Sequence, residues 1–246
     1  MISIKYASFP FFFLLIDSFT PTPAAAQAHK LDTMFVYATR IEKPINKVPV
    51  SVDRINISNI QTEMQQIGID EALVKAPGLF AQNKYNFAQD LRISIRGFGS
   101  RSTFGIRGIK IFVDGLPATL PDGQSSIDNL EINSLDHIEV VRTPSSSIYG
   151  PSSGGVINMY TEDGPTNKPF IEIGAIGGSF NYRKKQIKTG GQVDNLNYFL
   201  SLSRFKLDGY RDHSKTRNML MNSKFSYDIN DTSDLTLTLN ILNSPE

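Results

Sequence analysis

The sequence predicts an α+β domain followed by a run of antiparallel β-strands. Several short segments between residues 92 and 160 alternate apolar and polar side chains, as half-buried strands do, and end at turns rich in glycine or proline. Helix signals are confined to the part of the chain before residue 92 and to one short turn after Pro144. Residues 169–246 repeat the alternation over longer segments separated by short turns.

Residues 1–28 have the organisation of a secretory signal peptide. Lys5 supplies a positive start, residues 9–16 are apolar, and residues 24–28 offer small side chains for cleavage. The apolar run is shorter than the roughly 20 residues that a membrane-spanning helix needs. We predict a cleaved signal; the alternative is a disordered hydrophobic N-terminus.

Residues 29–47 contain an apolar segment flanked by basic residues, with no helical period. The segment consists of Asp32, Thr33, Met34, Phe35, Val36, Tyr37 and Ala38. An extended chain near a free N-terminus is mobile, and its unpaired backbone can add as a strand to the sheet of a partner. The alternative is a first strand of the following domain, with no partner role.

Residues 48–91 predict compact α/β structure. Short strands are expected at 48–52 and 54–57, and a short helix capped by Ser58 runs through Met64. Residues 70–75 predict a second helix, because its two acids lie at the end that the helix dipole favours for negative charge. Pro77 and Gly78 end that helix, and a strand with a polar, aromatic loop follows over residues 80–87.

Residues 92–160 carry the most informative segments. Strands are predicted at 92–96 and 109–113, and Asp114-Gly115 after the second strand is a strong turn dipeptide. A third strand covers 138–141, Pro144 starts a single helical turn that Gly150 ends, and a fourth strand covers 156–160.

Taken in order, these segments resemble the plug domain of TonB-dependent outer-membrane receptors. The matching runs are Ile95-Arg96-Gly97-Phe98, Val113-Asp114-Gly115-Leu116-Pro117 and a long run that includes Ile138-Glu139, Arg142, Tyr149-Gly150 and Gly154-Gly155-Val156-Ile157-Asn158. Residues 104–109 and 119–124 are most similar to the ferric-citrate branch of the family. Thr143 stands where the family usually has glycine, so we expect a reshaped turn, because threonine does not easily adopt positive φ.

The resemblance implies a domain order. Residues 29–47 would hold the TonB box, at residues 32–38, and a linker; residues 48–165 would form the plug domain. The turn-rich segment 161–168 marks the boundary, and residues 166–246 would supply the first transmembrane strands of a large β-barrel. Without the resemblance, a soluble antiparallel sheet would be the alternative for these strands.

The number of strands adds a further expectation. Five candidate strands cannot close a barrel wide enough to hold a domain, and an open sheet edge in lipid leaves backbone groups unpaired. We therefore expect an incomplete large β-barrel, from a fragment of a longer receptor or from a truncated gene product.

Three loops between plug strands are candidates for ligand binding, because family plugs contact ligand through three apices. The residues are Gln82, Lys84 and Tyr85 in the first loop, Ser100, Arg101 and Thr103 in the second, and Thr119, Asp122 and Gln124 in the third. Lys84 and Arg101 suit an anionic chelate, since arginine forks onto a carboxylate. The alternative for each residue is a solvated loop.

Two arginines at strand ends have a different predicted role. The resemblance implies that Arg96 and Arg142 pair with glutamates of the barrel wall and lock the plug in place. The alternative is a salt bridge inside the plug.

Composition excludes several functions. The formal net charge of +1 argues against nucleic-acid binding, and the chain has no cysteine. His29, His137 and His213 lack metal-ligand spacing, and we find neither a G-x-S-x-G elbow nor a dinucleotide loop. We therefore predict no enzyme, no cofactor and no metal site.

The function predicted from the sequence is energy-coupled uptake of a ferric chelate, of the siderophore or ferric-citrate type, across a Gram-negative outer membrane. Partners would be TonB with its inner-membrane complex, the ligand and outer-membrane lipid. Ligand bound outside would signal to the TonB box, and TonB would then pull or remodel the plug. The alternatives are uptake of cobalamin, another metal complex or a glycan by the same family, and a plug-like interaction module without transport.

Overall fold

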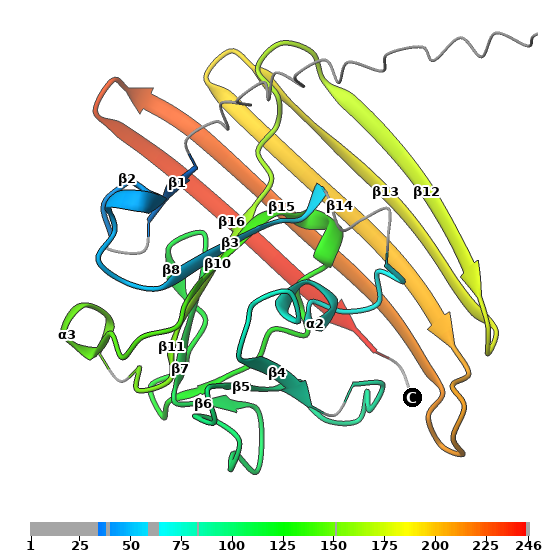
Figure 1. Ribbon diagram of the computed structural model, residues 1–246. Coiled ribbons are helices and arrows are strands. Elements are labelled where there is room, and N and C mark those ends of the chain that lie inside the picture. Colours follow the sequence, from blue (N-terminus) through cyan, green and yellow to red (C-terminus); the bar gives the residue numbers. More distant parts are fainter. Residues whose placement is uncertain (1–33, 38–39, 59–63, 83, 151, 245–246) are drawn as a thin grey trace, which may run out of the picture. The chain divides into compact units, whose positions relative to one another are not determined.

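The computed structural model describes residues 34–37, 40–58, 64–82, 84–150 and 152–244 (Figure 1). The predicted signal peptide, Asp32, Thr33 and Ala38 of the predicted TonB box, and most of the helix predicted from Ser58 to Met64 lie outside these ranges. In the described ranges, no helix has the length and apolar character needed to cross a lipid bilayer.

A five-stranded mixed sheet is the centre of the N-terminal domain, in the order β3-β10-β11-β7-β8. Its strands are β3 (Val52–Asn56), β10 (Leu135–Val141), β11 (Gly155–Thr161), β7 (Ile109–Val113) and β8 (Leu116–Pro117). β10 runs antiparallel to both β3 and β11, whereas β11 runs parallel to β7. The predictions at 109–113, 138–141 and 156–160 are confirmed, but the two strands predicted within 48–57 are the single strand β3.

Short pairs and helical turns surround this sheet. The pairs are β1 (Phe35–Val36) with β2 (Lys43–Pro44), β4 (Leu79–Gln82) with β5 (Arg92–Ile95), and β6 (Ile106–Arg107) with β9 (Gln124–Ser125). The helical turns are η1 (Ile45–Lys47), α2 (Asp70–Leu73), η2 (Ile132–Ser134) and α3 (Ser146–Tyr149). The predicted helix at 70–75 and the predicted turn after Pro144 are therefore present, each four residues long.

The strand alternation places one set of side chains in a continuous core. Ile95, Ile111, Ile138 and Ile157 are fully buried in it, and Leu73 of α2 packs against the same cluster. Complete burial of such a side chain contributes about 1.5–3 kcal/mol. The periodicity of the sequence thus locates the core correctly.

The turn after Arg142 contains Thr143, the residue at which the sequence predicts a reshaped turn. Among the described residues with positive φ, Gly150 and Gly155 are present and Thr143 is not. The threonine therefore keeps an ordinary backbone conformation, and positive φ is adopted by glycines later in the motif.

Residues 170–243 form a separate antiparallel sheet in which each strand pairs with the next (Figure 1). Its strands are β12 (Phe170–Gly178), β13 (Tyr182–Val193), β14 (Leu196–Leu207), β15 (Thr216–Asn230) and β16 (Ser233–Asn243). The five strands predicted after residue 168 are confirmed. The segment between β11 and β12 contains the predicted boundary, although the domain bounds themselves stay a prediction.

Gly155 is the glycine on which the central sheet depends most directly. Its φ is +135°, and a Cβ there would collide with the carbonyl oxygen of Val141 in the neighbouring strand. Gly155→Ala should therefore destabilise the protein by about 1–3 kcal/mol, measured by urea unfolding followed by circular dichroism. Gly177→Ala is the matched control, because the nearest atom to its new Cβ is 3.9 Å away. Equal stability of the two variants would contradict this account.

Candidate functional site

A buried ion pair joins the N-terminal domain to the second sheet. Glu131, at the start of η2, accepts a hydrogen bond from Nζ of Lys184 in β13 at 2.6 Å, and both residues are at most 5% exposed. Ser203 of β14 donates to the other carboxylate oxygen of Glu131. Lys184 also donates to the carbonyl oxygen of Gln66 at 2.5 Å. Each buried charge therefore has several partners, as desolvation requires.

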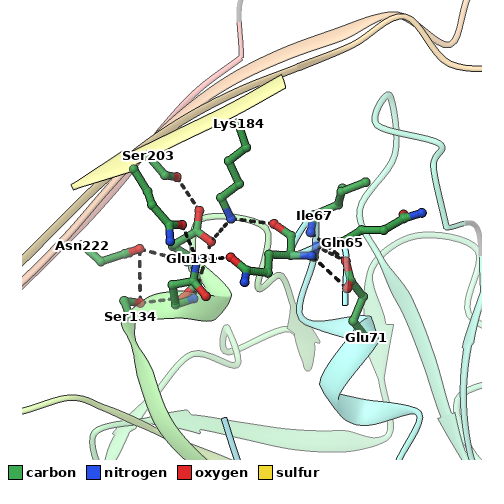
Figure 2. A network of polar contacts seen from close by, with 12 residues as sticks. Gln65, Ile67, Glu71, Glu131, Ser134, Lys184, Ser203 and Asn222 are labelled. Carbon is green, nitrogen blue, oxygen red and sulfur yellow. Dashed lines mark hydrogen bonds and ion pairs between the residues drawn. The ribbon is translucent and has the colours of Figure 1, made fainter. Parts of the chain in front are cut away.

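The polar contact continues along the sheet. The amide oxygen of Asn222 in β15 accepts from the backbone N–H of Glu131 at 2.9 Å, and its amide nitrogen donates to the carbonyl of Asn129. Asn133 donates to Gln186 of β13. Figure 2 shows Lys184, Ser203 and Asn222 pointing from the sheet toward Glu131. Strand alternation explains this convergence, since all three side chains lie on the same face of the sheet.

α2 positions the loop that receives Lys184. The carboxylate of Glu71, in the first turn of α2, accepts backbone N–H groups of Gln66 at 3.0 Å and Ile67 at 2.7 Å (Figure 2). The same loop binds the sheet a second time, because the hydroxyl of Tyr182 donates to the carbonyl of Gln65 at 2.7 Å.

A second group of ion pairs lies where the chain leaves the N-terminal domain. Lys188 of β13 contacts Glu162 at 2.8 Å, and Lys224 of β15 contacts Asp163 at 2.7 Å and Asp114 at 3.6 Å. Asp114 also accepts both the backbone N–H and the hydroxyl of Thr161, the last residue of β11. Asp114 of the Val113-Asp114-Gly115 motif thus fixes the chain where it leaves the N-terminal domain.

The predicted lock arginines lie elsewhere. Arg142 pairs with Asp53 through two nitrogens and donates to the carbonyl of Pro77, so its observed partners are within the domain. Arg96 is exposed, has positive φ, and forms no ion pair with the described residues. The structure instead joins acids of the domain to lysines of the sheet, which is the opposite polarity. Pairing of Arg96 or Arg142 with a barrel glutamate stays a prediction.

The described part of the predicted TonB box is held against the domain. Phe35 and Val36 pair with β2, and Val36 is fully buried against Phe112, Val141 and Tyr149. Arg54 donates to the carbonyl of Phe35 at 2.6 Å, and the N–H of Tyr37 donates to both oxygens of Glu139 at 3.0 Å. The expectation of a free, exposed segment is therefore wrong for Val36, because its side chain completes an apolar cluster.

A histidine lies beside Glu139, with its Nε2 3.7 Å from a carboxylate oxygen. The ring of His137 stacks on Tyr160 at 4.5 Å and lies 2.6 Å from Asp136. Burial of this ring opposes its protonation, but hydrogen bonds to Asp136 and Glu139 outweigh burial and raise the pKa of His137. The histidine is therefore disposed to carry a proton between two carboxylates.

Two of the three predicted ligand loops come together. β6 pairs with β9, and Arg107 of β6 contacts Asp122 at 3.6 Å and Gln124 at 3.1 Å. Arg101 and Thr103 are exposed, whereas the hydroxyl of Ser100 donates to Gly97. Thr119 has a structural role, because its hydroxyl accepts the N–H of Ile111 and contacts Ser125 at 2.6 Å.

The first predicted loop lines a hollow of about 930 Å³ beside the second sheet. Lys84 and Tyr85 contribute one side, and Phe180, Tyr210 and Arg211 from the connections of the sheet contribute the other. Lys84 contacts Asp70 at 3.4 Å, and Tyr85 donates to Gln65 at 3.0 Å. Gln82 accepts from Arg92 and is therefore committed to the β4–β5 pair.

Two carboxylates, those of Asp90 and Asp128, lie near the hydroxyl of Ser126, just after the third loop. The hydroxyl of Ser126 is 3.0 Å from Asp128 and 3.4 Å from Asp90. Burial, reinforced by the nearby Asp90 carboxylate, raises the pKa of Asp128 to about 6. In the described residues, no group of three or more histidine, aspartate or glutamate side chains is arranged to hold a metal ion.

Sequence analysis missed the residues that join the two sheets. Glu131 carries no motif, and Lys184 is one of three consecutive basic residues, Arg183 to Lys185. The signal in the sequence was strand alternation, which places Lys184 on the same face as Tyr182 and Lys188.

Comparison with known families gives a match to the TonB-dependent receptor plug domain. The family model covers residues 44–157, from β2 into β11. The match therefore includes Glu131, Glu139 and all three predicted ligand loops.

Solved structures extend the similarity into the second sheet. The pyoverdine outer-membrane receptor FpvA of Pseudomonas aeruginosa matches over 83% of this chain and 29% of its own, at 18% identity and a TM-score of 0.66. The ferric preacinetobactin receptor BauA of Acinetobacter baumannii matches over 83% and 30%, at 14% identity and 0.66. The alcaligin receptor FauA of Bordetella pertussis matches over 84% and 34%, at 18% identity and 0.64. This chain thus spans 29% to 34% of those receptors, and the similarity shows the fold of a plug with part of a barrel.

The Glu131–Lys184 pair yields a stability prediction. Lys184→Met should destabilise the protein by about 3–5 kcal/mol, because it leaves Glu131 buried without its cation. The double variant Lys184→Met/Glu131→Gln should recover most of that loss, in urea unfolding of the purified protein in detergent. Arg107→Met removes the exposed pair with Asp122 and should cost at most about 1 kcal/mol. A Lys184→Met loss no greater than this control would show that the pair does not hold the two parts together.

Asp128 yields a pH prediction. Its pKa is raised on folding, so the folded state binds more protons between about pH 4 and 6, and stability falls as pH rises through that window. Asp128→Asn should remove this fall. The unfolding free energy of the variant, relative to that of the unaltered protein, should therefore be about 2–3 kcal/mol more favourable at pH 7 than at pH 4. Unfolding free energies at both pH values measure the difference. Asp122→Asn, at an exposed carboxylate, is the control, and an unchanged pH profile in Asp128→Asn would refute the assignment.

Proposed function

We propose that the chain is the plug domain and part of the barrel wall of a TonB-dependent receptor, and that this receptor takes up a ferric siderophore across the outer membrane. The observation that carries the proposal is the plug seated on barrel strands by buried polar contacts, centred on Glu131 and Lys184. The similar solved structures are receptors for pyoverdine, ferric preacinetobactin and alcaligin, which favours an iron chelate as the ligand.

The ligand surface we propose combines charge with aromatic side chains. Lys84, Tyr85, Tyr210 and Arg211 line one hollow, and the guanidinium of Arg211 lies 5.0 Å from the ring centroid of Tyr210. A ferric chelate is often anionic and rich in hydroxyl groups, so cations and aromatic faces suit it. Arg101, Thr103 and Asp122 would supply further contacts from the paired loops. Gln82, Ser100, Thr119 and Gln124 would act through loop shape, because each is already hydrogen-bonded within the plug.

Coupling to TonB would begin at residues 34–37. Addition of this segment to a sheet of the partner requires a free backbone edge, whereas Arg54 and Glu139 now bind that edge. Ligand binding would therefore act by weakening these contacts.

The test measures uptake of iron from a ferric siderophore by cells whose only such receptor is the protein carrying this chain, with and without TonB. Val36→Pro should abolish both uptake and capture of the receptor by the C-terminal domain of TonB, because proline removes a backbone donor from β1. Val36→Ala is the matched control, since it changes the same side chain but keeps the backbone N–H that proline removes.

The outcomes separate the alternatives. Uptake that is independent of TonB, or unaffected by Val36→Pro at equal receptor abundance, would contradict the proposed coupling. Transport of cobalamin or a glycan in place of the siderophore would support a receptor of this family with a different substrate. Absence of the protein from the outer membrane would refute transport altogether.

A further inference from the structure

The face of the β12–β16 sheet that points away from Lys184 and Ser203 carries two kinds of side chain. Strand alternation defines this outer face, because neighbours of the buried residues point the opposite way. One cross-strand row consists entirely of apolar residues: Ile173, Ile187, Leu202, Met221 and Ile241 are aligned across all five strands. Ile173, Ile187 and Ile241 of this row are 78%, 40% and 52% exposed, and Leu202 and Met221 are partly exposed.

The apolar band continues toward the two-residue turns. Its last row aligns Val193, Leu196, Tyr227 and Leu235, which are all exposed. From Arg183 to Val193 the strand β13 has eleven residues, the upper end of the roughly 9–11 that a tilted strand needs to cross a hydrocarbon core. The apolar band covers the seven residues from Ile187 to Val193, so Arg183 and Lys185 lie at one edge of such a span.

Basic residues occupy the opposite end of this face. Arg183, Lys206 and Arg217 are aligned in one row, and Lys185 and Arg204 in the adjacent row. Lys206 contacts Asp208 at 3.4 Å, while the other four form no ion pair with any described residue. At the turn end of the face, none of the described strand positions holds lysine or arginine. We name these five residues the basic rows.

This arrangement needs a counter-charge from outside the chain. Like charges directly opposite each other on neighbouring strands repel. A cation facing lipid is strongly unfavourable at the membrane centre and tolerated only near the headgroups. The basic rows begin where the apolar band ends, so they lie at the level of the headgroups.

The lengths of the connections between strands indicate which leaflet the basic rows face. β14 and β15 are joined at the basic end by residues 208–215, whereas the turns at the other end, residues 194–195 and 231–232, have two residues each. Outer-membrane barrels keep short turns on the periplasmic side and longer loops outside. The basic rows would therefore face the outer leaflet.

We propose that Arg183, Lys185, Arg204, Lys206 and Arg217 bind the phosphate groups of outer-leaflet lipids, whose acyl chains lie along the apolar band. This inference rests on the proposed function, which places the sheet in the outer membrane. Arginine suits the role because its guanidinium binds phosphate through two parallel hydrogen bonds. One row of cations below another matches a lipid that carries more than one phosphate.

The experiment uses the whole receptor that carries this chain, extracted from the outer membrane in mild detergent. Binding of diphosphoryl lipid A is compared with binding of its dephosphorylated form. We expect the phosphorylated lipid to bind at least tenfold more tightly, and Lys185→Gln/Arg204→Gln/Lys206→Gln to remove that preference. Lys47→Gln/Lys75→Gln/Lys110→Gln, which removes the same charge from the plug, should retain it. The comparison of two lipids on the unaltered receptor needs no variant to fold.

The outcomes are separable from those of the proposed function. Equal binding of both lipids, or displacement of lipid A by millimolar inorganic phosphate, would overturn a lipid site. A dimer that buries the basic rows and excludes lipid would overturn it as well. If siderophore uptake is normal while the lipid preference is absent, the lipid inference alone fails. Absence of the receptor from the outer membrane would refute both.

Discussion

The relation between plug and sheet depends on the buried contact of Glu131 with Lys184. Either charge would be strongly destabilising if it were buried without the other, so the domain and the second sheet each supply a partner that the other needs. The surrounding groups are polar as well: Ser203, Asn222 and the Gln66 carbonyl supply hydrogen bonds rather than apolar surface. An apolar contact lies beside these groups, because Ile67 and Phe87 of the domain pack against Phe205 and its buried neighbours in the sheet. Polar and apolar contacts together fix the register of the two parts.

One segment of the plug connects the contact with the second sheet to residues 34–37. Glu131 begins η2 and binds the sheet, β10 follows directly, and Glu139 within β10 binds the N–H of Tyr37. Arg142, just after β10, pairs with Asp53 at the end of the sheet. A shift of η2 against the sheet would therefore be transmitted along a single strand to the segment that we propose TonB binds.

The alternation of side chains along its strands gives the second sheet two different faces. Its inner positions carry Lys184, Ser203 and Asn222 for the plug, while its outer positions form an apolar band with cations at one end. Because the side-chain period of a strand is two, a slip by one residue would exchange the faces. The buried ion pairs and the exposed apolar band thus depend on the same register, from opposite faces of the sheet.

Much of this architecture follows from the sequence. Periodicity located the strands at 109–113, 138–141 and 156–160 and the five later strands, and the helical turns α2 and α3 followed from acid, proline and glycine positions. Strand periodicity is local, so it survives without tertiary information. What the sequence left open was partnership: which acid meets which lysine, that Val36 is buried, and that Arg142 turns inward to Asp53. Those contacts join residues far apart in the chain, and only the folded backbone brings them within reach of one another.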